Sequence, residues 1–83
     1  MENLKEQLKM IRLQKRETLA TLSDKTGIDI SVLSKFEKGL RIPNGIQLDA
    51  IEKALNIKHR KLRTIWLAEK IVKEIGYEDN ALD

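Results

Sequence analysis

Residues 22–43, LSDKTGIDISVLSKFEKGLRIP, decide the fold of this chain. Two short helical segments in this stretch are separated by the turn Thr26-Gly27-Ile28-Asp29. Gly27 supplies the left-handed backbone that lets the chain leave the first segment at a sharp angle. Ile28 can fill the angle between the two helices, and the side chain of Asp29 can cap the free N–H groups of the second. The turn therefore predicts two short helices that meet at an angle.

Two arrangements fit such a turn. A turn of three or four residues that contains glycine, between two short helices, is typical of a helix-turn-helix. The second helix of that motif stands out from the domain and can enter the DNA major groove, which is about 12 Å wide. An ordinary helical hairpin within a bundle accounts for the turn chemistry equally well, so both interpretations stay open on the turn alone.

Helical periodicity continues on both sides of this stretch, and no long alternating strand pattern interrupts it. The helices are expected over about residues 4–16, over 19–26, over 30–38, after Asn44, and over about 58–75 with an end at Gly76. Thr18, Asp29 and Asn44 are the candidate N-caps of the second, third and fourth helices. The buried face of the fourth helix is predicted to consist of Ile46, Leu48, Ile51 and Leu55. Helices thus account for nearly the whole chain.

Length and composition exclude several classes of protein. A chain of 83 residues forms one small domain. Cysteine is absent and His59 is the single histidine, so we expect neither disulfides nor a metal site, and no cofactor. No serine has a histidine base nearby, so no catalytic residues are predicted and the protein is not expected to be an enzyme. Apolar runs are too short for a membrane span, and no signal-peptide core is visible, so a cytoplasmic protein is expected.

Charge is distributed unevenly along the chain. Residues 1–63 contain 14 Lys and Arg against 8 Asp and Glu, a net charge of +6. Residues 64–83 contain 2 against 5, a net charge of −3. The basic part suits a polyanion such as double-stranded DNA, whereas the acidic part does not. The basic run at residues 58–63 either contacts DNA phosphate from the flank or keeps the start of the fifth helix soluble.

Residues 8–57 resemble the Cro/CI-type (XRE) helix-turn-helix family. The resemblance rests on Leu8, Ile11, Arg12, Leu22, Ser23, the turn Gly27-Ile28-Asp29, the segment 34–43 (SKFEKGLRIP) and Leu55. It implies an all-α, lambda-repressor-like fold, a compact bundle of about five helices that contains a helix-turn-helix. It also implies a DNA-binding domain over residues 1–57. Beyond the resemblance, residues 58–83 are expected to form a C-terminal helix that extends the core and provides a dimer interface.

The resemblance further implies roles for individual residues. The candidates for contacts with DNA bases are Ile30, Ser31, Val32 and Lys35. The candidates for contacts with DNA phosphates are Thr18, Ser34, Lys38 and Arg41. Arg12 and Glu37 match a structural ion pair that joins the first helix to the end of the third. Phosphate contacts of this kind fix the register of a protein on the duplex, whereas base contacts specify sequence.

The sequence departs from the family pattern in several places. Leu19 occupies the position of a glutamine-like phosphate contact, Glu17 that of an apolar residue, and Ser23 that of a small alanine. Ile30 and Val32 stand where polar base contacts are common. Apolar side chains can contact the C5-methyl group of thymine. The same two side chains can also pack against a partner or against the core, and both possibilities stay open.

The fifth helix lies outside the segment that resembles the family. Its apolar residues cover more of the helix surface than a single narrow stripe. An exposed apolar surface on a small domain usually marks an interface. The candidate dimer contacts are Leu62, Ile65, Trp66 and Ile71. The alternative is that this helix folds back and completes the core of its own domain.

These expectations combine into one leading functional hypothesis. The chain is predicted to be a transcriptional regulator that binds a palindromic operator as a homodimer, with the third helix in the major groove. The alternative is a protein-interaction module of the same fold, such as an antitoxin or a bridging factor, which uses the apolar C-terminal helix to hold another protein.

Overall fold

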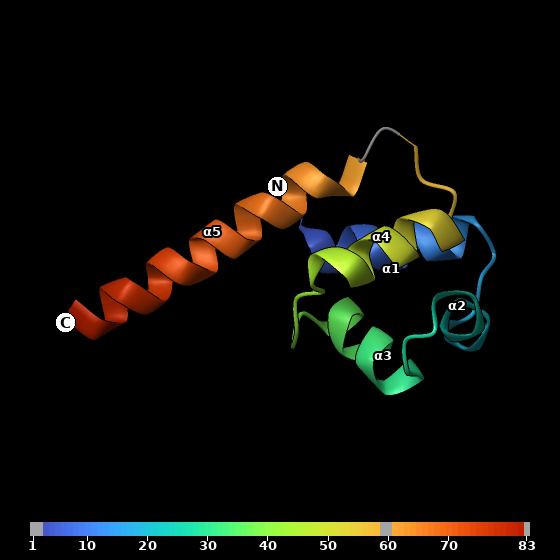
Figure 1. Cartoon of the computed structure of the whole chain (residues 1–83), viewed down its shortest axis with the longest axis horizontal. Helices are drawn as coiled ribbons and strands as arrows, with labels where there is room; N and C mark the ends of the chain where they lie inside the picture. The colour runs from blue at the N-terminus through green and yellow to red at the C-terminus, as the bar shows by residue number, and fades with distance from the viewer. Residues whose placement is uncertain (1–2, 59–60, 83) are drawn as a thin grey trace.

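A computed structural model describes residues 3–58 and 61–82, of which 74–82 are described by their backbone. The described residues form five helices and no strand, which confirms the predicted all-α class. The helices are α1 (Leu4–Gln14), α2 (Leu19–Thr26), α3 (Ile30–Lys38), α4 (Gly45–Ala54) and α5 (Lys61–Leu82). Figure 1 shows α1 to α4 gathered in one cluster, from which the C-terminal part of α5 extends outward. Helix α1 packs against α3 and α5, and α2 packs against α3 and α4.

Most helix boundaries agree with the sequence prediction, and two differ. Helices α2 and α3 have the predicted bounds. Helix α1 ends at Gln14 rather than at Arg16, because Arg16 adopts a left-handed backbone with φ of 58° that turns the chain toward α2. The prediction that the fifth helix ends at Gly76 is wrong, because α5 continues to Leu82. A glycine inside a helix costs only about 1 kcal/mol relative to alanine, so it does not by itself end the helix.

Side-chain caps start α2 and α4 as predicted. Thr18 Oγ1 accepts a hydrogen bond from the backbone N–H of Thr21 at 3.0 Å. Asn44 Oδ1 accepts one from the backbone N–H of Gln47 at 2.8 Å. Each of these caps is reciprocated by the side chain of the third helical residue, which bonds the backbone N–H of the cap. Such capping boxes satisfy N–H groups that the first helical turn leaves unpaired.

The turn between α2 and α3 has the predicted backbone, with one difference in its capping. Gly27 has a φ of 74°, and its N–H donates to the carbonyl oxygen of Ser23 at 2.8 Å. Ile28 is buried between the helices, as predicted. Asp29 occupies the N-cap position of α3, but its side chain makes no capping hydrogen bond. It accepts a hydrogen bond from the Ser31 hydroxyl instead, so the capping role predicted for this carboxylate is wrong.

One hydrophobic core joins all five helices, and it corrects the prediction for the fourth. Its members are Leu4, Leu8, Ile11, Leu22, Ile28, Leu33, Phe36, Leu48, Ile51, Leu55, Leu62 and Trp66. Leu48, Ile51 and Leu55 form the inner face of α4, as predicted. Ile46, which was expected to join them, is 82% exposed. It precedes Leu48 by two residues, about 200° around the helix, and therefore faces outward.

The first turns of α5 complete this core, which corrects part of the predicted dimer surface. Leu62 is fully buried and Trp66 is 8% exposed, both against other helices of the same chain. The indole Nε1–H of Trp66 donates to the carbonyl oxygen of Pro43 at 2.6 Å. Ile65 is partly buried against the core, and only Ile71 of the four candidate dimer contacts is exposed. Leu62 and Trp66 therefore close their own domain and offer no surface to a second chain.

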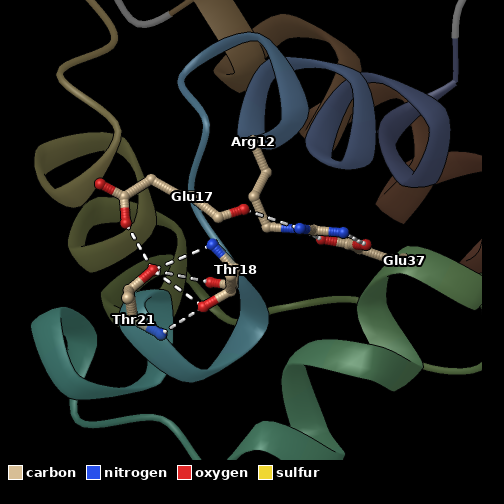
Figure 2. A network of polar contacts seen from close by, with 5 residues as sticks. All are labelled: Arg12, Glu17, Thr18, Thr21 and Glu37. Atoms are coloured by element: carbon tan, nitrogen blue, oxygen red, sulfur yellow. Dashed lines mark hydrogen bonds and ion pairs between the residues drawn. The ribbon is translucent and has the colours of Figure 1, made fainter.

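An ion pair joins α1 to the C-terminal part of α3, as the family resemblance implies. Arg12 Nε donates to Glu37 Oε2 at 2.7 Å, and Arg12 Nη2 donates to Glu37 Oε1 at 3.0 Å. The two side chains are only 11% and 10% exposed. Nη1 of the same guanidinium donates to the carbonyl oxygen of Glu17 at 2.8 Å, as Figure 2 shows. The hydrogen bond to Glu37 raises the pKa of Arg12, so the guanidinium stays charged.

Glu17 links this ion pair to the start of α2. Its backbone carbonyl holds Arg12, and its carboxylate accepts a hydrogen bond from the Thr21 hydroxyl at 2.6 Å (Figure 2). The Lys25 ammonium pairs with the same carboxylate. The bonds from Lys25 and then from Thr21 lower the pKa of Glu17. A charged residue at this otherwise apolar position of the family pattern is thus used to fix the α1–α2 connection.

The Arg12–Glu37 pair provides a test of how α3 is held. Glu37→Ala leaves the Arg12 guanidinium unpaired in a nearly buried site, which is expected to destabilise the fold by about 3–5 kcal/mol. For a domain of this size, that corresponds to a fall of more than about 10 °C in the melting temperature followed by circular dichroism. Lys25→Met removes a pair whose lysine is half exposed and should change the melting temperature far less. Equal melting curves for wild type and Glu37→Ala would show that the pair does not hold α3.

Candidate nucleic-acid interface

The outward face of α3 is set by the residues that the helix buries. Leu33 and Phe36 point into the core and are each 2% exposed. With 3.6 residues per turn, the opposite face carries Ser31, Lys35 and Lys38, at spacings of four and three residues. All three are exposed. Because α3 lies at the edge of the helix cluster (Figure 1), this polar and basic face is free to approach a ligand.

The four candidates for base contacts fall into two groups. Ile30, Ser31 and Lys35 are exposed at the start and middle of α3. Val32 is partly buried and packs against the core. For Val32 the structure therefore favours the packing role over a contact with a thymine methyl group, whereas Ile30 remains available for one.

The four candidates for phosphate contacts surround this face. Lys38 is exposed in the last turn of α3, and Arg41 is exposed in the loop that follows. Thr18 is exposed at the first turn of α2, where its hydroxyl oxygen is occupied by the helix cap. Ser34 is half-buried beside the outward face. The two cations are thus the candidates best placed to meet a polyanion.

Lys5 is a further cation at this end of α3 that the sequence did not single out. Gly39 ends α3 with a left-handed φ of 75°. A Cβ at that position would lie 2.8 Å from Cδ of Lys5, so the lysine stem of α1 runs directly against the end of α3. Lys5, Gly39 and Arg41 line one shallow hollow of the surface. Lys5 precedes the stretch that resembles the family, and only the packing of α1 on α3 brings it to this site.

The basic run at residues 58–63, which leads into α5, contributes less to this surface than its sequence suggests. The guanidinium of Arg63 lies 5.1 Å from the ring centroid of Trp66 and pairs with Asp49 on α4. It therefore braces α5 on α4 and does not face outward as a phosphate contact. His59 and Arg60, the middle of this run, lie outside the described residues.

The part of the chain that the structure describes contains neither a metal-binding cluster nor a membrane-spanning helix. No group of three or more His, Cys, Asp or Glu side chains there is arranged to hold a metal ion. None of the described helices is both long and apolar enough to cross a membrane.

Comparison with known proteins identifies the family. A family model described as helix-turn-helix matches residues 8–62, which is about two thirds of the chain. Comparisons with curated proteins and with solved structures found no match. The matched segment contains the Gly27 turn, the outward face of α3 and the Arg12–Glu37 pair, and it extends to Leu62 in the first turn of α5. The chain belongs to the Cro/CI-type (XRE) helix-turn-helix family of DNA-binding transcription regulators.

Proposed function

We propose that this protein controls transcription by binding a palindromic operator as a homodimer, with α3 of each chain in a major groove. The observation that carries the proposal is the outward face of α3, where exposed Ser31 and Lys35 lie opposite the buried Leu33 and Phe36. A helix in the major groove presents such a face to base edges. The α3 face thus supplies the sequence-specific contacts.

Cations at the C-terminal end of α3 supply the contacts with the DNA backbone. Lys5, Lys38 and Arg41 are exposed around Gly39, and they come from α1, α3 and the following loop. Cations that flank a recognition helix fix its register through phosphate contacts and carry no sequence information. Because Arg12 and Glu37 join α1 to α3, these cations keep a constant position relative to the α3 face.

The middle of α5 is the proposed dimer surface. Leu67, Ile71 and Val72 there are 50%, 54% and 68% exposed, and they follow Trp66, the last core residue of α5. Leu67 and Ile71 are about one helical turn apart and share a side of α5, whereas Val72 is turned about 100° away from Ile71. The C-terminal part of α5 extends away from the helix cluster (Figure 1). These residues replace Leu62 and Trp66 as the apolar contacts between chains.

The charge pattern of α5 favours an antiparallel pairing of two copies. Lys61 lies at the start of α5, and the sequence is acidic at Glu74, Glu78 and Asp79 toward its end. Two antiparallel α5 helices related by a twofold axis place the basic start of one near the acidic end of the other. An isologous contact of this kind is usual for dimers. It also sets the two recognition helices at a fixed separation, about 34 Å for half-sites one DNA turn apart.

The alternative function, a protein-interaction module of the same fold, draws on the same α5 surface. It is favoured by the exposure of two further large apolar side chains, Leu40 and Ile46, outside α5. A partner protein would then cover α5 in place of a second copy. The oligomeric state of the isolated chain separates the two proposals, since a homodimer forms without any other protein.

Salt dependence tests the DNA contacts. If Lys5, Lys38 and Arg41 neutralise phosphates, log Kd for duplex DNA rises linearly with log salt concentration, with a slope of about 0.9 per phosphate. Lys38→Ala should weaken binding about equally for all sequences and reduce the slope by about one. Lys53→Ala, on the exposed side of α4, removes the same charge and should leave the slope unchanged. Fluorescence anisotropy with a labelled duplex measures both quantities, and affinity that is independent of salt contradicts the proposal.

A second experiment tests the dimer surface. Ile71→Glu places a charge in the proposed apolar contact and should convert a dimer to a monomer in sedimentation at micromolar concentration. Affinity for a palindromic duplex should fall with it, because a monomer presents only one recognition helix. Ile46→Glu makes the same change at an exposed isoleucine of α4 and should leave the mass unchanged. A wild-type chain that is monomeric and still binds the palindrome with full affinity would refute the role of α5.

A further inference from the structure

We infer that Asp29 selects cytosine in the operator by accepting a hydrogen bond from the cytosine amino group, and that Ser31 positions its carboxylate. This inference rests on the proposed function, in which the start of α3 lies in the major groove. Neither the turn pattern nor the family match assigns this role to Asp29, whose expected part was to cap α3.

Asp29 is the one N-cap of α2, α3 and α4 whose side chain leaves the helix uncapped. Thr18 and Asn44 each bond the third backbone N–H of their helix and form capping boxes. Asp29 has the same opportunity, since aspartate is among the most favourable N-cap residues and such caps contribute about 1 kcal/mol. Its side chain makes no such bond. The Asp29 carboxylate therefore lies away from the position in which it would cap α3.

Ser31 holds the Asp29 carboxylate on the outward side of α3. The Ser31 hydroxyl donates to Asp29 Oδ2 at 2.7 Å. Both residues are exposed, and Ser31 belongs to the face that also carries Lys35. Among the described residues, none donates a hydrogen bond to Asp29 Oδ1, and no cation lies within ion-pair distance of the Asp29 carboxylate. One carboxylate oxygen is thus fixed by Ser31 while the other is free to accept from a ligand.

A carboxylate without a hydrogen-bond donor at the start of α3 is unfavourable for DNA binding. The exposed cations on and beside the α3 face, which attract phosphate, are Lys5, Lys35, Lys38 and Arg41. An acidic side chain is repelled by the same phosphates, and it loses its hydration when it is buried in the major groove. Asp29 avoids this penalty only where the DNA offers it a hydrogen-bond donor.

The major groove offers few such donors. Cytosine presents its N4 amino group there, whereas guanine and thymine present only acceptors beside the thymine methyl group. Adenine presents the N6 amino group next to the N7 acceptor, which repels a carboxylate and suits the side-chain amide of asparagine or glutamine instead. Asp29 therefore favours cytosine, disfavours adenine, and rejects guanine and thymine.

Lys35 adds a complementary contact on the same face. It lies one helical turn beyond Ser31, and a lysine donates readily to O6 and N7 of guanine. The Asp29 acceptor, held by Ser31, and the Lys35 donor, one turn beyond Ser31, are two different contacts in a fixed order along the helix, and the half-site must match that order. The half-site is thus expected to contain a cytosine that meets Asp29 and a guanine, on either strand, that meets Lys35. The guanine follows the cytosine within the length of about one turn of the α-helix.

The experiment is selection of bound sequences from a random duplex library with the full chain, followed by affinity measurements on single-base variants of the selected site. Wild type should show one position where cytosine is preferred over guanine and thymine by about tenfold or more. Asp29→Asn should lose that preference and favour adenine at the same position, because an amide both donates and accepts. Asp24→Asn removes the same charge from an exposed site on α2 and should leave the selected sequence unchanged.

Substitution of Ser31 tests the positioning role. Ser31→Ala should weaken the preference at the cytosine position while leaving the melting temperature and the salt dependence close to wild type, and Ser31→Thr, which keeps the hydroxyl, should restore it. An identical selected sequence for wild type and Asp29→Asn overturns the inference, whereas salt-dependent binding of both variants leaves the proposed function standing. Absence of duplex binding by wild type refutes the proposed function itself.

Discussion

The nearly buried Arg12–Glu37 ion pair is the interaction on which the DNA-binding surface depends. It is the bidentate contact that ties α3 to α1, while Nη1 of Arg12 also holds the backbone that leads into α2. A charge left alone in such a site is costly, so the pair strongly disfavours other orientations of α3. Once α3 is fixed, Leu33 and Phe36 determine which of its faces points outward. The position of Lys5 beside Gly39 follows from the same α1–α3 contact.

Helix α5 divides into two parts with different roles. Its first turns are anchored by Leu62 in the core, by the bond from Trp66 to Pro43, and by Glu69, whose carboxylate accepts from the backbone N–H of Leu4 at 2.6 Å. These contacts hold the helix against α1 and against the loop that follows α3. The exposed apolar residues Leu67, Ile71 and Val72 follow Trp66, and Leu67 still lies within the anchored part. The broad apolar surface seen in the sequence is therefore a core segment followed by a proposed interface on the same helix.

The start of α3 lacks the side-chain cap that α2 and α4 have. In α2 and α4 the N-cap side chains serve their own helices, which stabilises each first turn. In α3 the corresponding carboxylate is held by Ser31 on the outward face. The helix relies instead on Leu33, Phe36 and the ion pair of Glu37 for its place in the domain. Tertiary packing thus compensates for a missing cap.

Sequence alone determined the features that depend on neighbouring residues. The bounds of α2 and α3, the left-handed Gly27 and the caps at Thr18 and Asn44 follow from backbone sterics and from hydrogen bonds across three or four residues. The family pattern added the Arg12–Glu37 pair, which local rules do not reveal.

Only the tertiary structure decided which apolar side of a helix is buried and which polar group finds a distant partner. In the folded chain Ile46 is exposed, Trp66 is buried, Arg63 lies against Trp66 and Asp49, and the Asp29 carboxylate accepts from Ser31 instead of capping α3. Each of these outcomes depends on contacts with residues far away in the chain or on a choice between local bonds of similar energy. The sequence pattern alone does not give the free-energy difference between the alternative arrangements of these side chains.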